Sequence, residues 1–368
     1  MKPKTKMFIM GLVTLMGTII GAGFLGIPKA LTLGGYFQGA ILMVLVAFFM
    51  FVMCLFTTEL ALNTKNVHQM PGMIRKYLGK KWGILASIFF ALISTGAIIA
   101  YLLGSSKILS SITGISQLYC MIAYFSFVFI IVYKGLGSIK KAALIIEIAL
   151  FSFLIILAFF LRNDFSFANL DFSATGNLII PFGVILFSFG GYNVMAQIEL
   201  ITKSSKDLMV KISFFGMLLS FIFFFAFSTI MLGVFGSEVA DIATETLTGV
   251  MGGLGNLIAL FAMTGSFIMS GMLLKDMLHN DYKINPNLSA FIALFFPLFF
   301  ILLFGPGFID TLAFTGAVVA GVFAVLMCAT IIASRRKVKK FYYKAPFGNI
   351  LPILAAIFFL IGIIVTLL

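Results

Sequence analysis

The sequence predicts an all-α membrane protein with eleven transmembrane helices, arranged as two inverted repeats of five helices and one extra helix. The prediction rests on composition, on the lengths of the apolar runs and on two matching glycine-rich interruptions. Hydrophobic residues make up 62% of the 368 residues, only 10% are charged, and the mean hydropathy is +1.17. These values exclude an ordinary soluble domain and are typical of a multi-pass membrane protein.

Eleven apolar runs are long enough to cross about 30 Å of hydrocarbon. They lie near residues 7–33, 36–62, 82–106, 115–133, 142–161, 178–201, 212–235, 250–274, 288–304, 311–333 and 348–368. No segment between them is long enough to fold separately, so we expect one transmembrane domain over residues 1–368. The first run continues well past the length of a signal peptide, and we therefore expect an uncleaved first helix.

The basic residues predict the orientation. An N-terminus in the cytoplasm places 22 of the 25 Lys and Arg residues on the cytoplasmic side, as membrane insertion favours. The opposite loops are acidic, with Glu238, Asp241 and Glu245 among their residues. We therefore expect a plasma-membrane protein whose C-terminus lies outside. The net charge of +13 then reflects topology in a lipid bilayer, and we expect no nucleic-acid partner.

The first interruption lies at residues 17–28, GTIIGAGFLGIP, inside the first apolar run. Glycine and proline weaken a helix there, and an unwound backbone persists in a membrane only where protein or a water-lined cavity satisfies its polar groups. Close helix packing is the alternative, because Gly17 and Gly21 have GxxxG spacing. Gly21, Gly23 and Gly26 also spell GxGxxG, but without a preceding strand this does not indicate a dinucleotide site.

A second interruption lies one repeat further along, at residues 187–191, FSFGG, in the sixth run. Thr18 and Ser188 are 170 residues apart, and the blocks at 7–161 and 178–333 each contain five spans. Because five is odd, the second block must insert upside down, with 348–368 as an extra helix. Matching breaks in two inverted halves indicate the binding site of a secondary transporter.

Three stretches resemble a known family: GTIIGAGFLGIPKA in helix 1, ELALNT at the end of helix 2 and LFSFGGYNVMAQIE in helix 6. They are similar to the amino acid/auxin permease family of the amino acid-polyamine-organocation superfamily, especially to prokaryotic hydroxy and aromatic amino acid permeases. The resemblance implies a LeuT-type fold with discontinuous helices 1 and 6, and amino acid import driven by an ion gradient. Sodium-coupled animal relatives usually carry Asn at the position of Thr18, and many relatives have His and then Pro within 192–196, so these departures weigh against sodium coupling.

The chemistry of an amino acid predicts the substrate site. Backbone N–H groups of Ala22 and Gly23, at the start of the outer half of helix 1, should meet the carboxylate. Carbonyl groups freed at Ile19 and in the stretch 185–188 should accept from the ammonium. A side chain at Gly21 or Gly23 would block this approach. The expected substrate-binding residues are Thr18, Ile19, Gly21, Ala22, Gly23, Tyr101, Ile185, Phe187, Ser188, Phe189, Gly190 and Tyr192. They leave open whether the substrate side chain is a small or medium apolar group or an aromatic ring.

Two coupling ions are possible, and no other cofactor or metal is expected. By analogy with the LeuT-type fold, sodium would use carbonyl groups near Gly17 and Ile20 and the hydroxyls of Thr264 and Ser266, although such hydroxyls often bond to their own backbone. A proton needs a titratable group within a span. Glu147 lies about 9 Å into helix 5 from the basic loop by helical rise, and it is our preferred proton carrier.

Other charged segments have simpler interpretations. Glu199 can pair with Lys203 one turn on, and Glu59 can extend toward the inner basic loop. The connection 236–249 is either a lid or a solvated loop. We expect the basic run 335–340 to anchor helix 10 to anionic lipid headgroups.

Together these features predict a monomeric secondary transporter that imports a small-molecule amino acid by alternating access and is coupled to protons. The alternatives are a sodium-coupled symporter and an amino acid sensor without net transport. A channel would need rings of charge, and an enzyme would need a nucleophile with its base or a metal cluster within the membrane. Cys54, Cys120 and Cys328 lie in separate apolar runs and have none of the spacings of a metal or redox site.

Overall fold

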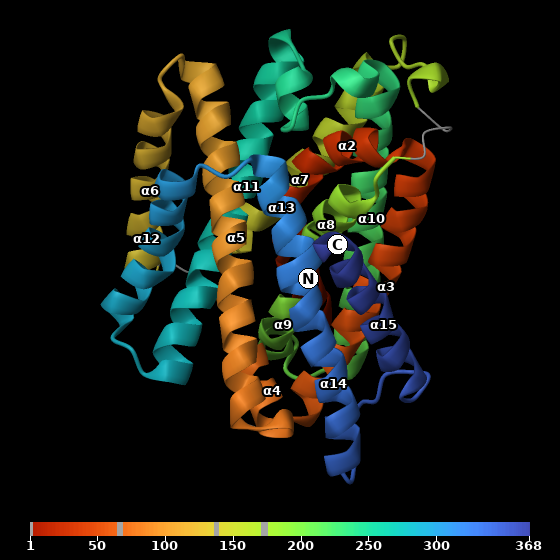
Figure 1. Ribbon diagram of the computed structural model, residues 1–368, viewed down its shortest axis with the longest axis vertical. Helices are drawn as coiled ribbons and strands as arrows, with labels where there is room; N and C mark the ends of the chain where they lie inside the picture. The colour runs from red at the N-terminus through yellow and green to blue at the C-terminus, as the bar shows by residue number, and fades with distance from the viewer. Residues whose placement is uncertain (1–2, 65–68, 136–139, 171–175) are drawn as a thin grey trace.

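The computed structural model describes residues 3–64, 69–135, 140–170 and 176–368 (Figure 1). The α-helices are α1 (Pro3–Ile19), α2 (Gly23–Gly34), α3 (Tyr36–Asn63), α4 (Met70–Leu78), α5 (Lys80–Thr113), α6 (Gln117–Lys134), α7 (Lys140–Phe160), α8 (Ile179–Ser188), α9 (Met195–Thr202), α10 (Lys206–Phe235), α11 (Gly249–Tyr282), α12 (Pro286–Phe304), α13 (Phe308–Phe314), α14 (Gly321–Lys337) and α15 (Ile350–Leu367). Short 3₁₀ segments are η1 (Phe167–Asn169), η2 (Gly191–Val194), η3 (Gly236–Glu238) and η4 (Ala243–Thr246), and η5 (Thr315–Ala320) is a π-helical turn.

The helices follow the predicted spans. Within the described residues, nine helices are long and apolar enough to cross a membrane, and α1 with α2 forms a tenth span that is bent by 47°. The described apolar part of α7, Leu144–Phe160, falls at the remaining predicted span. Hydropathy thus located the spans because each must cover the hydrocarbon layer with apolar side chains.

Two groups of four spans make up most of the molecule. α5, α6, α11 and α12 pack against one another on the left of Figure 1, and α1/α2, α3, α8/α9 and α10 pack together on the right. Each group takes two spans from each predicted repeat. α7 contacts α1, α10 and α11, while the α13–η5–α14 segment contacts α8, α5 and α15. These two elements therefore lie where the groups meet.

Both predicted breaks are present. α1 ends at Ile19 and α2 begins at Gly23, with the N–H of Gly21 donating to the carbonyl of Ile19 at 3.0 Å. α8 ends at Ser188, and a 3₁₀ turn over Gly191–Val194 precedes α9. The second break therefore begins at Phe189, just after the stretch 185–188 in which free carbonyl groups were expected.

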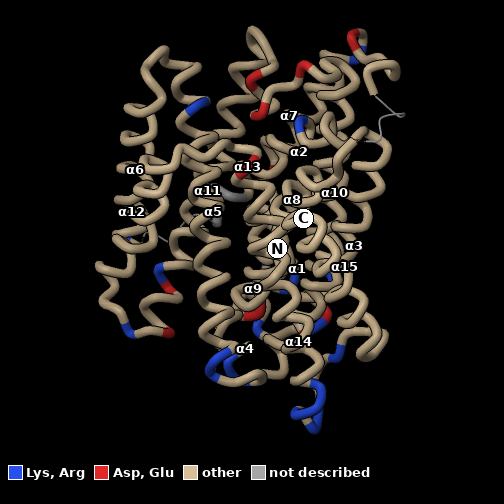
Figure 2. The backbone as a smooth tube through the Cα atoms, viewed as in Figure 1, with Lys and Arg blue, Asp and Glu red and all other residues tan. Residues whose placement is uncertain are grey.

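Charge distinguishes the two ends of the molecule. Lys and Arg gather where α4 and the end of α14 lie, which we call the basic end, and Asp and Glu are prominent at the opposite, acidic end (Figure 2). Along the chain, α1 and α9 occupy the basic half of the broken spans and pack against each other. α2 and α8 occupy the acidic half and also pack together.

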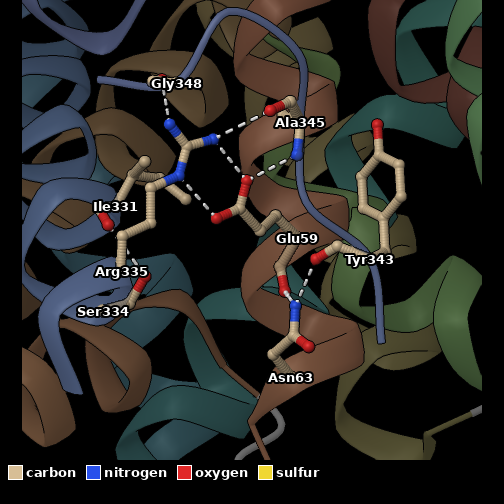
Figure 3. A network of polar contacts seen from close by, with 8 residues as sticks. All are labelled: Glu59, Asn63, Ile331, Ser334, Arg335, Tyr343, Ala345 and Gly348. Carbon is tan, nitrogen blue, oxygen red and sulfur yellow. Dashed lines mark hydrogen bonds and ion pairs between the residues drawn. The ribbon is translucent and has the colours of Figure 1, made fainter. Parts of the chain in front are cut away.

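A buried polar network closes the basic end, and we call it the Glu59–Arg335 network (Figure 3). The carboxylate of Glu59 accepts from Arg335 Nε at 2.7 Å and Nη2 at 2.6 Å, and from the backbone N–H of Ala345 at 2.7 Å. Arg335 also donates to the carbonyl groups of Ala345 and Gly348. The exposed fractions of the two charged side chains are only 3% for Arg335 and 1% for Glu59.

This network corrects the expectation for Arg335, the first residue of the run 335–340. Arg335 does not face lipid headgroups, because its guanidinium is enclosed between α3, α14 and the connection to α15. Arg336, Lys337, Lys339 and Lys340 are exposed, and Lys337 donates to the carbonyl of Tyr77 in α4 at 2.8 Å. Glu199, expected to pair with Lys203, instead accepts from the hydroxyl of Ser204.

Candidate functional site

A cavity of about 60 Å³ lies at the meeting point of the two breaks. Its lining residues come from α1, the first break, α2, α5, α8, the second break with η2, α11 and η5: Thr18, Ile19, Gly21, Gly23, Phe90, Ile93, Ser94, Ala97, Tyr101, Phe187, Gly190, Tyr192, Asn193, Ser270, Leu273 and Ala320. Rings and aliphatic groups dominate this wall, with a few hydroxyl and amide groups among them. This is the usual composition of a pocket for a small organic ligand. We call it the central cavity.

Eight of the predicted substrate-binding residues lie in this wall. They are Thr18, Ile19, Gly21, Gly23, Tyr101, Phe187, Gly190 and Tyr192. Gly21 illustrates why glycine occurs here: a Cβ at this position would lie 2.8 Å from Ser266 Oγ and 3.0 Å from the Tyr101 hydroxyl. The backbone of the first break thus approaches two hydroxyl groups that a side chain would displace.

The other four predicted residues are not in the wall of the central cavity. Ala22 is buried just before α2, and Ile185 lies within α8. Ser188 donates to the carbonyl of Val184 at 2.6 Å, within the same helix. Phe189 is fully buried against Phe224 of α10, with ring centroids 4.9 Å apart. Phe189 follows the last residue of α8, and its side chain packs against α10 instead of lining the central cavity.

The first turn of α2 gives the central cavity its electrostatic character. α2 begins at Gly23, and the first N–H groups of any helix lack acceptors within that helix. Its N-terminus therefore carries positive potential and favours an anionic group. This site matches the predicted contact with a substrate carboxylate. The carbonyl of Ile19, expected to receive the ammonium, already accepts one bond from Gly21.

A second cavity of about 290 Å³ lies in the basic half, and we call it the basic-side cavity. Its wall comes from α1, α7, α9 and α11 and consists of Val13, Thr14, Gly17, Thr18, Ile20, Ile146, Glu147, Gln197, Leu200, Ile201, Ala262, Gly265, Met269, Met272 and Asp276. Thr18 belongs to both walls, so the two cavities are neighbours. Gly17, Ile20 and Glu147, predicted for ion coupling, all line the larger one.

Glu147 is the most unusual group in the basic-side cavity. Its side chain is buried, and its Oε2 atom has no hydrogen-bond partner among the described residues. A buried carboxyl oxygen without a partner is costly unless a ligand, a water molecule or a proton satisfies it. Asp276, closer to the basic end of α11, supplies a second carboxyl group to the same wall.

The two hydroxyl groups predicted for sodium are not brought together. Ser266 Oγ donates to the carbonyl of Gly17 at 3.0 Å, so α11 and α1 are in direct contact at this point. Thr264 instead donates to the carbonyl of Leu260 and lies 3.0 Å from the hydroxyl of Tyr124 on α6. Two positions apart on an α-helix differ by about 200° in direction, so neighbouring hydroxyls of this spacing face opposite sides.

The acidic half of the broken spans is closely packed. A Cβ at Gly23 would lie 2.7 Å from the Cα of Ser188, so α2 and α8 touch along their backbones. Phe24 packs edge-on against Phe223 and Phe227 of α10, with centroid distances of 5.4 and 5.1 Å. The central cavity is therefore separated from the acidic end by several layers of side chains.

The connection 236–249 adds to this closure. It forms η3 and η4, and its residues Val239, Ile242 and Leu247 are buried. Glu245 pairs with Lys107 of α5 at 3.0 Å. The segment thus packs onto the helices like a lid, whereas a solvated loop would leave its apolar side chains exposed.

Sequence reasoning missed three polar residues of the central cavity: Ser94, Asn193 and Ser270. Two of them could have been found from helical spacing. Ser94 lies seven residues before Tyr101 and Ser270 four residues after Ser266, so each shares a face with a predicted residue. Asn193 follows Tyr192 in the second break, where the pattern gives no preferred direction.

Comparisons with known proteins identify the family of the chain. A family model described as the tryptophan/tyrosine permease family matches residues 4–368. The low affinity tryptophan permease of Escherichia coli (strain K12) is 23% identical over 390 residues, covering 95% of this chain and 92% of that protein. Its counterpart in Escherichia coli O157:H7 is 23% identical over 392 residues with the same coverage. The matched family is not the amino acid/auxin permease family that we expected, although the likeness to aromatic amino acid permeases is confirmed.

Solved structures show the fold. Mhp1, a nucleobase-cation-symport-1 family transporter in a closed conformation with bromovinylhydantoin bound, superposes with a TM-score of 0.70 at 14% identity, covering 97% of this chain and 91% of that one. An Eremococcus coleocola manganese transporter, in complex with an aromatic bis-isothiourea substituted compound, gives 0.68 at 14% identity, with 99% and 86% covered. The predicted all-α transporter fold of the LeuT type is thereby confirmed.

Proposed function

The chain belongs to the tryptophan/tyrosine permease family, and we propose that it imports an aromatic amino acid by alternating access, coupled to protons. Its relatives are permeases rather than enzymes, and the chain is a multi-pass membrane protein. The observation that carries the proposal is the central cavity, where two broken spans meet a wall of aromatic side chains. Backbone groups of the breaks suit the amino acid moiety, and Phe90, Phe187 and Tyr192 suit a ring.

We assign the basic end to the cytoplasm, because basic loops are retained there during insertion. The basic-side cavity then belongs to an inward-facing state, in which the substrate leaves between α1, α7, α9 and α11. Close packing of α2 against α8 and the lid over residues 236–249 support the same assignment. Import requires rocking of the α1/α2, α3, α8/α9 and α10 group against the other four helices.

Glu147 supports proton coupling. Its carboxyl group is buried, its Oε2 atom has no described partner, and it lines the basic-side cavity, as Gly17 does. A proton taken up from outside and released here would link its movement to that of the substrate. Sodium coupling is the second candidate, and Ser266 supports it, since its hydroxyl reaches the carbonyl of Gly17. Thr264, turned toward α6, gives no such support.

Transport assays in proteoliposomes test this proposal. Purified protein should accumulate labelled tryptophan or tyrosine when the outside is more acidic, and an imposed sodium gradient alone should have no effect. Glu147→Gln should abolish pH-driven accumulation, because the neutral amide cannot carry a proton, while exchange of labelled for unlabelled substrate continues. Uptake that only equalises the substrate concentrations on the two sides, and that no imposed gradient changes, would contradict active transport.

The sensor alternative makes a different prediction. A protein that only senses an amino acid would bind tryptophan without counterflow across the membrane. Counterflow in the native protein therefore excludes it. Unchanged pH-driven uptake by the Glu147→Gln variant would eliminate Glu147 as the proton carrier. It would not affect the proposal that the substrate is an aromatic amino acid.

A further inference from the structure

Asn193 is a polar group of the central cavity for which the transport mechanism above has no use. It lies in the 3₁₀ turn Gly191–Val194, immediately before α9. Its side chain lines the cavity, and its Oδ1 atom is buried without a hydrogen-bond partner among the described residues. A buried acceptor without a donor is unfavourable, and in the wall of a binding cavity a ligand can supply the donor.

Asn193 follows the second break, whereas the backbone groups that suit the amino acid moiety belong to the first break and the start of α2. Tyr101, Gly21 and Ser266 lie close together, and Phe90 lies eleven residues from Tyr101 along α5, or about 16 Å by helical rise. Phe90 is on the basic side of Tyr101, the side toward which α9 also runs from Asn193. The wall of the cavity thus extends along α5 from Tyr101 to Phe90, and the second break contributes the amide group of Asn193 to it.

From this arrangement we infer that Asn193 selects substrates whose aromatic ring carries a hydrogen-bond donor. An indole N–H or a phenol O–H would donate to Oδ1, whereas a benzene ring would bury the amide oxygen without a donor. Sites that hydrogen-bond a polar group reject the analogue lacking it far more strongly than apolar pockets reject a change of size. This inference rests on the proposed function and adds to it the residue that distinguishes tryptophan and tyrosine from phenylalanine.

Ser94 does not replace Asn193 in this role. Its hydroxyl already donates to the carbonyl of Phe90 at 3.0 Å within α5. The Tyr192 hydroxyl also has no described partner. The Tyr192 ring, however, stacks on Phe323 of α14 with centroids 6.4 Å apart, and its hydroxyl lies near Cys54 and Cys328. Asn193 therefore remains the amide acceptor of the cavity wall.

The test measures inhibition of labelled tryptophan uptake in proteoliposomes by a series of unlabelled amino acids. Tryptophan and tyrosine should inhibit at least about tenfold more strongly than phenylalanine, the factor that corresponds to about 1.4 kcal/mol. 3-Benzothienylalanine has a sulfur atom in place of the indole N–H at nearly the same size, and it should also be at least about tenfold weaker than tryptophan. This comparison needs no variant, so it does not depend on how a substitution folds.

Asn193→Leu should bring tryptophan, 3-benzothienylalanine and phenylalanine to within about threefold of one another. Asn256→Leu is the matched control, because Asn256 in α11 also has a buried Oδ1 without a described partner but is outside both cavity walls; it should keep the native ranking. Equal inhibition by tryptophan and 3-benzothienylalanine in the native protein, or a native ranking in Asn193→Leu, would overturn the role of Asn193 alone. No transport of any aromatic amino acid would instead overturn the proposed function.

Discussion

The Glu59–Arg335 network and the wall of the two cavities are both polar and buried, yet they differ in how their groups are satisfied. In the network, the Glu59 carboxylate accepts three hydrogen bonds and Arg335 reaches two carbonyl groups as well. In the cavities, Glu147 Oε2 and Asn193 Oδ1 have no partner in the described part of the chain. Satisfied groups hold the basic ends of α3 and α14 together, and unsatisfied groups are available to a proton or a substrate.

The comparison teaches that burial of charge alone does not identify a transport site in this chain. Glu59 and Glu147 are both carboxyl residues inside spans, and both side chains are buried. The two carboxyl groups differ in their supply of donors. Arg335, 276 residues away, donates to Glu59, whereas Glu147 lines the basic-side cavity and its Oε2 atom has no partner among the described residues. Substitutions in the two regions can break or sharpen this contrast.

The largest effect should come from Glu59→Gln. It leaves the buried guanidinium of Arg335 without its anion, and breaking a buried pair in this way costs about 3–5 kcal/mol. The melting temperature of the purified protein in detergent should fall accordingly. Glu147→Gln removes a charge from an equally buried position without a described partner, and it should leave the melting temperature at or above the native value.

A double variant checks the origin of that loss. Glu59→Leu with Arg335→Met removes both charges and should recover part of the stability lost in Glu59→Gln, since an apolar pair can replace a buried ion pair. Recovery should be partial, because Arg335 also holds the carbonyl groups of Ala345 and Gly348. Equal melting temperatures for Glu59→Gln and Glu147→Gln would remove the distinction between the two regions.

An intermediate effect should separate two neighbouring glycines. Gly23→Ala places a methyl group 2.7 Å from the Cα of Ser188, and such overpacking costs about 1–3 kcal/mol in melting experiments. Gly21→Ala meets only the side chains of Ser266 and Tyr101, which can rotate, so it should weaken substrate binding with a smaller loss of stability. A stable Gly23→Ala protein would show that α2 and α8 separate easily.

The smallest effect should come from Ser266→Ala. It removes one hydrogen bond to the Gly17 carbonyl, worth about 1 kcal/mol. Thr264→Val serves as the matched hydroxyl deletion, directed toward α6 instead of α1. Uptake driven by the pH gradient should persist in both variants. Sodium-stimulated uptake in the native protein that disappears only in Ser266→Ala would reassign the coupling ion.

Most of the fold could be predicted from the sequence, because a membrane imposes a length and an apolar surface on every span. The break after Ile19 was also predictable, since Gly21 and Gly23 weaken the helix in the middle of the bilayer. The Glu59–Arg335 network was not. Its members come from opposite ends of the chain, and a local pattern of charges indicates lipid contact as readily as a buried pair.

The site was predicted less completely, and the reasons are geometric. Phe187 and Phe189 are two positions apart near the end of α8, so only one can face the central cavity, and sequence alone does not say which. Thr264 and Ser266 are also two positions apart on a helix, so their hydroxyl groups point in different directions, and this could have been predicted from the sequence. Asn193 lies in a 3₁₀ turn after the break, where no helical periodicity fixes the direction of a side chain.

The Glu59–Arg335 pair also constrains the order in which the protein can be assembled. Arg335 leaves the ribosome 276 residues after Glu59, and Ala345 and Gly348 follow later still. During synthesis, Glu59 therefore has no Arg335 partner until the spans between them have been made. Closure of this contact is thus a late step of biogenesis, which can take place only after the spans up to α14 have been made.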